Sequence, residues 1–267
     1  MSITTEKSLG TEAAAPQVAL APVRIERKGL RSYLFMPVVL ALVLLALYLY
    51  ISSQELDTIE QRSLNSEFLL AKTWEHIQLT VVSTILVILI AVPLGVLLTR
   101  DFAGSLRPFF LGIANIGQAV PTIGVLALLA VAFNFLFFKA AIVGLVAYTV
   151  LPVLRNTMVG LQQVDENVLE AGRGMGISKW GVLTRIELPL AVPIILAGVR
   201  TALVINVGAA TLAAYIAAGG LGSVLVAGLS TNRITVQITG AVLTLVLALF
   251  IDYLAGIAED VLRPKGL

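Results

Sequence analysis

The chain has 267 residues, of which 58% are hydrophobic and only 13% charged, and its mean hydropathy is +0.96. Soluble domains carry about 25% charged residues, so this composition excludes an ordinary soluble enzyme and a disordered chain and indicates an integral membrane protein. The net charge of +2 is too small to indicate nucleic-acid binding. The absence of cysteine excludes disulfides, thiolate metal sites and a cysteine nucleophile, and the single histidine, His76, cannot form a zinc site alone.

The first 32 residues are polar and end in a basic cluster ahead of a long apolar stretch. This stretch, Tyr33–Ile51, carries no charge, is too long for the apolar part of a signal peptide and has no A-x-A cleavage site. We therefore expect residues 33–51 to form an uncleaved first transmembrane helix. Residues 1–32 are then expected to be a cytoplasmic tail, disordered over Met1–Ala21.

The rest of the chain contains apolar stretches that are long enough to cross a bilayer, which takes about 20 residues. They lie at His76–Thr99, twice between Arg107 and Arg155, within Leu188–Asn232 and at Ile234–Ile251. The stretch after Arg107 carries a single charge, Lys139, and is predicted to form two helices joined by a tight turn near Asn134–Lys139. Together with the first span, these stretches predict an all-α membrane protein with six transmembrane helices.

The basic residues distinguish the two sides of the membrane, because cytoplasmic loops are enriched in lysine and arginine. With the N-terminus inside, the cytoplasmic set is Lys7, Arg24, Arg27, Lys28, Arg31, Arg100, Arg107, Arg155, Arg173, Lys179, Arg185, Arg263 and Lys265. The outside set contains only Arg62, Lys72, Lys139 and Arg233. A full crossing by the Gly-rich segment Thr211–Leu229 would place Arg263 and Lys265 outside. We therefore expect this segment to be re-entrant or half-crossing, with both termini cytoplasmic.

The loop after the fourth predicted span holds the longest polar stretch of the membrane portion. Asp165 is a candidate N-cap for a first short helix. Three glycines are predicted to break this helix, namely Gly172, Gly174 and Gly176. Residues Ile177–Ile186 are predicted to form a second short helix that ends at Pro189. This bent pair carries a narrow apolar stripe, so it either lies on the cytoplasmic surface of the protein itself or docks onto a cytoplasmic partner.

Six residues of this loop reproduce the signature EAA---G---------I-LP with every spacing kept: Glu170, Ala171, Gly176, Ile186, Leu188 and Pro189. Gly172 stands where the signature usually has its second alanine. In these residues the chain resembles the membrane subunits of binding-protein-dependent ABC importers. The resemblance covers about residues 73–256, which leaves residues 257–267 as a cytoplasmic C-terminal tail. It implies the type I importer permease fold, with the loop forming coupling helices that sit in a cleft of the ATP-hydrolysing subunit.

The resemblance further implies that Glu170 and Arg173 supply charged contacts to the ATPase, while Gly172 and Gly176 allow close approach and a bend. The resemblance also implies a non-catalytic subunit in the bacterial inner membrane. Its partners would be a second permease subunit, identical or related, cytoplasmic ATP-binding subunits that hold ATP and Mg, and an extracytoplasmic solute-binding protein. No cofactor is expected on this chain.

The sequence agrees with a subunit that draws its energy from a partner. No G-x-x-x-x-G-K-[ST] phosphate loop occurs, and the GRGMG run at 172–176 follows a predicted helix instead of a strand. An ion-coupled secondary transporter would show intramembrane acids and inverted repeats. Only Asp252 lies near a predicted span, and no convincing repeat is present. A further alternative is a membrane scaffold without a transport role, in which the exposed loop would serve only to bind a partner.

Three runs resemble a narrower branch of the importer family. They are ANIGQAVPTIG (114–124), LPVLRNTMVGLQQVD (151–165) and ATLAAYIAAGGLGSVLVAGL (210–229). All three look like the osmoprotectant branch, which imports glycine betaine, choline, carnitine or related quaternary amines. Methionine importers share the general layout, so an amino acid such as methionine is the alternative substrate.

Two groups of residues are candidates for the pathway itself. Asn115, Gln118 and Thr122 have the spacing of one face of the third helix, where they either bridge neighbouring helices or line the translocation path. Three glycines of the re-entrant segment, Gly219, Gly220 and Gly222, serve either ordinary close packing or a gate near the axis between two subunits.

Charged and aromatic residues in the spans have further possible roles. Arg200 lies deep in an apolar stretch and is predicted either to pair with Asp252 or to extend toward the cytoplasmic side. Quaternary ammonium ions bind in aromatic cages, for which this chain offers Phe133, Phe135, Tyr148 and Tyr215. Such residues also favour membrane interfaces, and we place the selective site on the external binding protein.

Overall fold

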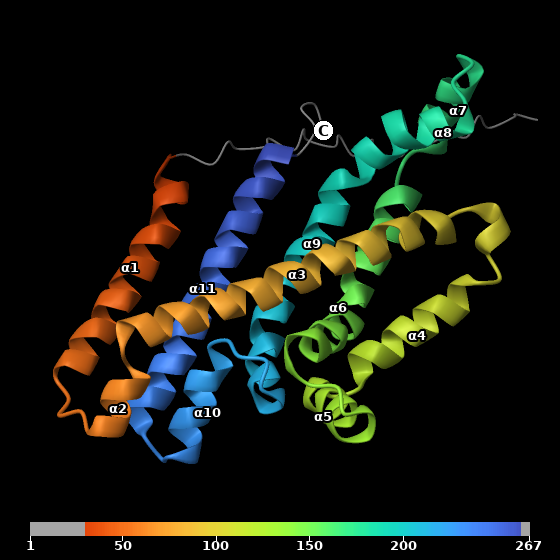
Figure 1. Ribbon diagram of the computed structural model, residues 1–267. Coiled ribbons are helices and arrows are strands. Elements are labelled where there is room, and N and C mark those ends of the chain that lie inside the picture. The colour runs from red at the N-terminus through yellow and green to blue at the C-terminus, as the bar shows by residue number, and fades with distance from the viewer. Residues whose placement is uncertain (1–29, 263–267) are drawn as a thin grey trace, which may run out of the picture.

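The computed structural model describes residues 30–262, and within this range every regular element is a helix (Figure 1). The all-α prediction is therefore confirmed for the described part of the chain. Residues 1–29 and 263–267, which include most of the predicted N-terminal tail and the end of the predicted C-terminal tail, lie outside it. The last helix runs on to Leu262, so residues 257–262 are helical.

Five segments between residues 30 and 262 are long and apolar enough to cross a membrane. Four of them are the helices α1 (Leu30–Ser52), α3 (Ser66–Leu98), α6 (Phe137–Gln162) and α11 (Ile234–Leu262), and the fifth contains α9 (Leu188–Ala210). The remaining predicted span, which is the third along the chain, is a pair of helices, α4 (Arg107–Ala119) and α5 (Thr122–Phe133), which meet at an angle of 91°. The sequence-based count of six is met when this bent pair is taken as one span.

The bend between α4 and α5 has a local cause. Pro121 has no backbone N–H and disfavours a helical conformation of the residue before it. Val120 accordingly has extended backbone angles and ends α4. The next turn follows the prediction, because α5 ends at Asn134 in the left-handed conformation and α6 begins three residues later.

Helix α6 lies at the centre of the bundle, where α3, α4, α5 and α9 pack against it. Its buried side chains include Leu145 and Leu154, which belong to two apolar clusters shared with neighbouring helices. Helix α1 packs against α11 at the edge of the bundle, and only 11% of the residues in its apolar stretch are buried. The central helices therefore form the protein core, and α1 exposes most of its surface to lipid.

The short helices divide between two sides of the bundle (Figure 1). The side that we call the α7 side carries α7 (Glu166–Gly174), α8 (Lys179–Val182), the first turn of α1 and the last turn of α11. The opposite side, the α10 side, carries α2 (Thr58–Ser63), α5 and α10 (Gly222–Ser230). There Arg233 Nη2 lies 2.6 Å from Asp57 Oδ2, which joins the α1–α2 loop to the start of α11.

The Gly-rich segment stays on the α10 side. It consists of a short 3-10 helix, η3 (Thr211–Ile216), a glycine turn and α10. Nine residues of helix in α10 measure about 14 Å, far less than a bilayer core of about 30 Å. The expected re-entrant or half-crossing arrangement is therefore confirmed.

The prediction of a second short helix that ends at Pro189 is wrong. Helix α8 continues through a π-helical turn at Leu183–Glu187 directly into α9, with Pro189 in its first turn. A proline ring clashes with the carbonyl four residues earlier in a regular α-helix, and a wider π turn avoids that clash. The second short helix of the signature loop and a membrane span are therefore parts of one continuous helix.

Candidate functional site

The loop that carries the signature begins with a well-capped helix. Asp165 is the N-cap of α7, as predicted, and its side chain accepts the backbone N–H of Asn167 at 2.9 Å. Arg173 Nη1 lies 2.7 Å from Glu166 Oε1, which links the two ends of α7. The Leu169 side chain is buried. These interactions hold α7 as a defined unit that projects from the bundle (Figure 1).

Two glycines of the signature loop differ in environment and backbone conformation. Gly172 is buried where α7 meets α8, and a Cβ built there would lie 2.7 Å from Ile186 Cδ1. Gly176 has φ +81°, a left-handed conformation that costs other residues roughly 1–2 kcal/mol. The chain therefore turns at Gly176, and the close packing at Gly172 is made within the chain, against Ile186.

The signature residues separate into an exposed and a packed group. Glu170, Ala171 and Gly176 are exposed on α7 and the turn after it. Ile186, Leu188 and Pro189 are partly buried at the joint between the π turn and α9. Next to the exposed group lies a surface hollow lined by Met175, Gly176, Ile177, Ser178, Trp180, Gly181, Thr184 and Arg185. The Met175 and Trp180 side chains at this hollow are 74% and 71% exposed, so an apolar surface is available to a partner.

A buried ion pair that the sequence analysis missed fastens this loop to α3. Arg100 Nη2 lies 2.5 Å from Glu187 Oε1, and Arg100 Nη1 lies 3.1 Å from Glu187 Oε2. The Glu187 side chain is only 7% exposed. Glu187 stands between the signature residues Ile186 and Leu188, but its burial and its partner follow only from the packing of α3 against the π turn.

The glycine turn of the re-entrant segment is held by the first turns of the α3 span. Glu75 Oε2 accepts the backbone N–H of Gly220 at 2.8 Å. His76 Nδ1 accepts the N–H of Leu221 at 3.2 Å, while its Nε2 contacts the Val207 carbonyl at 2.9 Å. Gly219 and Gly220 have φ of +86° and +81°, which favours glycine at both positions. Neither Glu75 nor His76 was among the predicted site residues.

The close-packing interpretation of the third candidate glycine accounts for its position. A Cβ built at Gly222 would lie 2.0 Å from the Thr211 carbonyl oxygen. Such a contact with backbone cannot relax without moving η3 or α10. The Gly222 position therefore lets the two short elements of the re-entrant segment touch.

The expectation of one polar helix face is wrong for Thr122. Asn115 and Gln118 lie on α4, but Thr122 begins α5 beyond the 91° bend and is buried. Asn115 is exposed. Its Oδ1 accepts a hydrogen bond from Arg155 Nη2 at 2.7 Å, and its Nδ2 donates a hydrogen bond to the Leu111 carbonyl at 2.7 Å. Asn115 therefore connects α4 with α6.

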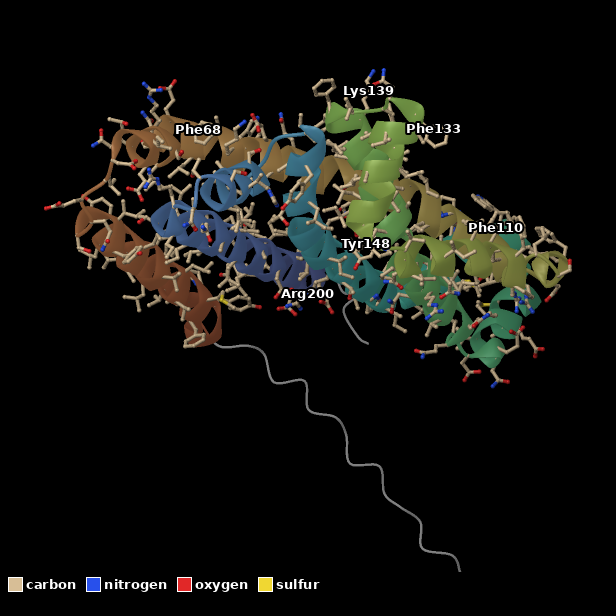
Figure 2. The ribbon with its side chains drawn as sticks, turned by 90° about the horizontal axis from the view of Figure 1, so that it is seen from below. Phe68, Phe110, Phe133, Lys139, Tyr148 and Arg200 are labelled. Atoms are coloured by element: carbon tan, nitrogen blue, oxygen red, sulfur yellow. The ribbon has the colours of Figure 1, made fainter. Side chains whose placement is uncertain are left out.

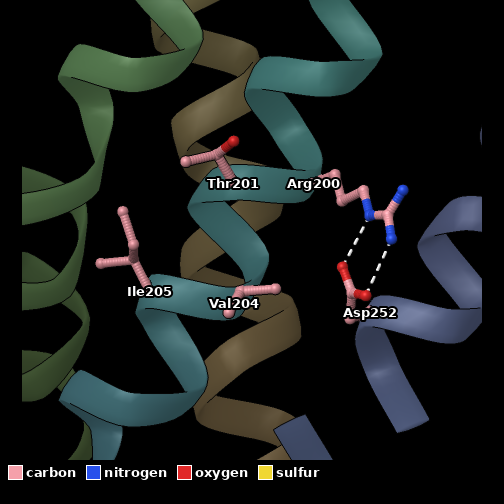
Figure 3. Close-up of a pocket in the computed structure, with 5 residues that line it drawn as sticks. All are labelled: Arg200, Thr201, Val204, Ile205 and Asp252. Carbon is pink, nitrogen blue, oxygen red and sulfur yellow. Dashed lines mark hydrogen bonds and ion pairs between the residues drawn. The ribbon is translucent and has the colours of Figure 1, made fainter. Parts of the chain in front are cut away.

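The predicted pairing of Arg200 with Asp252 is confirmed (Figure 3). Arg200 Nε and Nη2 lie 2.6 and 2.8 Å from the two Asp252 carboxylate oxygens, and Glu259 Oε2 is 3.5 Å from Nη1. This bidentate geometry is the strong form of a charge-assisted hydrogen bond. It joins α9 to α11 and neutralises the arginine inside the span.

The four aromatic candidates make no ring–ring contact with one another among the described residues. Figure 2 shows Phe133 beside Lys139 at the α5–α6 turn, away from Tyr148 in the body of α6. Tyr215 lies in η3. Over residues 33–262 the one ring–ring contact is Phe109 with Phe110, so no pair of the candidates is stacked.

Comparison with known families now assigns the chain. Residues 91–264 match the family described as "Binding-protein-dependent transport system inner membrane component". The chain belongs to this family. The match confirms the resemblance seen in the loop signature, and the helical bundle is that of an inner-membrane permease with several spans.

The permease is similar to curated proteins over most of their length. It is 42% identical to the glycine betaine/carnitine/choline transport system permease protein OpuCB and 43% identical to the choline transport system permease protein OpuBB, both of Bacillus subtilis. Each match covers 76% of this chain and 92% of the relative. The osmoprotectant import permease protein OsmW of Salmonella typhimurium is 36% identical, over 79% of this chain and all of the relative.

Solved structures share the permease fold. The MetNI methionine ABC transporter in an inward-facing conformation matches with a TM-score of 0.64 and 26% identity, over 73% of this chain and 96% of that chain. An amino acid ABC transporter matches with a TM-score of 0.63 at 17% identity, over 78% of this chain and 99% of that chain. The second likeness concerns the fold alone. Helix α1 precedes the range matched by the family.

Proposed function

We propose that this chain is the membrane subunit of an ATP-driven importer for a small osmoprotectant such as glycine betaine, choline or carnitine. The observation that carries the proposal is the 42–43% identity, over 92% of their length, with two permeases named for these solutes. A solute-binding protein delivers the solute from outside, and two permease subunits, identical or related, enclose the pathway. ATP and Mg bind to two cytoplasmic ATPase subunits, and this chain contributes no catalytic group.

The signature loop is the site where the ATPase docks in this proposal. Glu170, Ala171 and Arg173 are exposed on α7, and Met175 and Trp180 offer apolar anchors beside them. An exposed helix with such anchors suits a helix-in-groove contact. The α7 side then faces the cytoplasm, as the distribution of basic residues predicts.

The structure suggests how motion at the loop reaches the pathway. Gly172 packs against Ile186, and the Arg100–Glu187 pair joins the π turn to α3, so α7, α8 and the start of α9 move together. ATP binding draws the two ATPases together, and α9 carries the displacement across the membrane. At its far end the re-entrant segment is tied to α3 through Glu75 and His76. A displacement of α9 together with α3 thereby reaches the re-entrant segment and changes which side of the pathway is open.

Two rival functions have less support. The likeness to the methionine transporter rests on 26% identity, which is lower than the identity with the osmoprotectant permeases. An ion-coupled transporter needs a free intramembrane acid, whereas Asp252 is paired with Arg200 at 2.6 Å. Substrate choice is therefore the point that an experiment must decide.

We expect the purified complex in liposomes to take up radiolabelled glycine betaine only when ATP is present on the side of the membrane where the ATPase subunits lie. Excess carnitine should compete, whereas excess methionine should leave uptake unchanged, because methionine lacks a quaternary ammonium group. A complex with an ATPase variant that cannot hydrolyse ATP is the control. Methionine uptake without competition by betaine would refute the substrate and leave the importer assignment intact.

The proposed orientation predicts which positions a membrane-impermeant thiol reagent reaches. The chain has no native cysteine, so single substitutions are labelled without background. Cysteine at the exposed position Glu55, close to the Asp57–Arg233 pair, should be labelled in intact cells. Cysteine at the exposed position Lys179 should react only after permeabilisation. The reverse pattern would show that the chain is inserted the other way round.

A further inference from the structure

Arg155 was counted with the cytoplasmic basic residues, but the structure places it within the membrane-spanning helix α6, where its side chain is exposed. It lies on α6, seven residues before the end of that helix at Gln162, which corresponds to about 10 Å from the α7 side. A guanidinium in contact with lipid tails is costly, so charged groups within spans face protein or water. The face of α6 that carries Arg155 is therefore turned away from lipid, toward the pathway or the second subunit.

The partner of Arg155 is an amide and not a carboxylate. Its Nη2 donates to Asn115 Oδ1 at 2.7 Å, and no acid lies within ion-pair distance of it among the described side chains. Arg200 in α9 differs, since Asp252 holds it with two hydrogen bonds. Arg155 thus retains its full positive charge on an exposed surface.

Asn115 is itself fixed, and it orients the guanidinium. Its Nδ2 donates to the Leu111 carbonyl on the same helix, which leaves Oδ1 directed at Arg155. An arginine has five N–H donors in a planar fork, and the bond to Asn115 uses one of them. The remaining edge of the fork suits two parallel hydrogen bonds to a carboxylate.

We propose that Arg155, oriented by Asn115, is a specificity-determining residue that binds the carboxylate of a zwitterionic solute as it passes through the permease. This inference rests on the proposed function and narrows its substrate class to quaternary amines that also carry a carboxylate, such as glycine betaine and carnitine. Choline has the cation without the carboxylate, so Arg155 repels it. A single charge-assisted contact to an exposed side chain is weak enough for release, which a conducting pathway requires.

The test compares solutes within one variant of the complete complex. We expect Arg155→Gln in proteoliposomes to lower the maximal rate of ATP-driven uptake of glycine betaine and carnitine about tenfold, in line with loss of a charge-assisted hydrogen bond. Choline uptake should stay the same or rise. Arg155→Lys keeps the charge and should restore part of the betaine rate. Arg62→Gln, which removes an exposed charge from α2, is the matched control and should change neither rate.

The outcomes separate this inference from the proposed function. An Arg155→Gln complex that loses betaine and choline uptake equally would overturn the inference, because a residue that only stabilises the fold or contacts a protein carboxylate cannot distinguish the solutes. Unchanged betaine uptake would overturn it as well. A wild-type complex that takes up none of the three solutes would instead refute the proposed function. A fall confined to the two carboxylate-bearing solutes would support both.

Discussion

Charge reversal at Glu170 is expected to abolish ATP-driven uptake while the permease remains folded in the membrane. Glu170 is exposed on α7, and its side chain makes no hydrogen bond or ion pair within residues 33–262, so the fold does not depend on its charge. A charge placed wrongly at the centre of a protein interface costs several kcal/mol. Glu170→Lys should therefore reduce capture of the ATPase subunit and uptake at least tenfold.

A second substitution in the same loop tests its shape independently of charge. Gly176→Trp adds bulk to the exposed turn and forces a side chain onto a residue with φ +81°, so it should abolish docking as well. Gly174→Ala is the matched control, because a Cβ at Gly174 meets nothing within 4 Å. Pull-down of the ATPase, uptake and thermal unfolding in detergent are measured together. Normal docking and uptake in both Glu170→Lys and Gly176→Trp would eliminate this loop as the docking site.

Loss of Arg100 is expected to destabilise the permease more than loss of any exposed charge. Arg100→Met leaves the Glu187 carboxylate, which is 7% exposed, without its ion-pair partner. Breaking a buried pair in this way costs about 3 kcal/mol, which lowers the unfolding temperature of a chain of this size by roughly 10 °C. The measurement is thermal unfolding of the detergent-purified permease.

The double variant Arg100→Met with Glu187→Gln separates the charge effect from packing. It should recover more than half of the lost stability, because the neutral amide removes the unpaired buried charge. Arg62→Met removes an exposed arginine that has no ion pair among the described residues and should change stability by less than about 0.5 kcal/mol. If Arg100→Met unfolds at the wild-type temperature, the pair does not hold the loop to α3.

The failures of the sequence analysis share a physical cause. Periodicity indicates helices and apolar length indicates spans, but neither shows where a helix bends. The predicted face of Asn115, Gln118 and Thr122 was wrong because Pro121 turns the chain by 91° between them. The end predicted at Pro189 was wrong because a π turn accommodates the proline within a continuous helix.

Local chemistry by itself determined several features of this protein. Apolar length determined the spans, the Asp165 side chain determined the start of α7, and the spacing from Glu170 to Pro189 determined the family. Each of these features depends on residues that are close in sequence, so a pattern along the chain is enough to find it.

The tertiary structure alone decided which polar groups meet. Arg100 contacts Glu187, which lies 87 residues away in the sequence. His76 contacts Val207 and Leu221, which lie 131 and 145 residues away. It also chose between the two roles predicted for Arg200 by placing Asp252 beside it, and it brought Arg155 to Asn115. Such contacts depend on how whole helices pack, because a buried or membrane-embedded polar group is stable only where a partner lies opposite it.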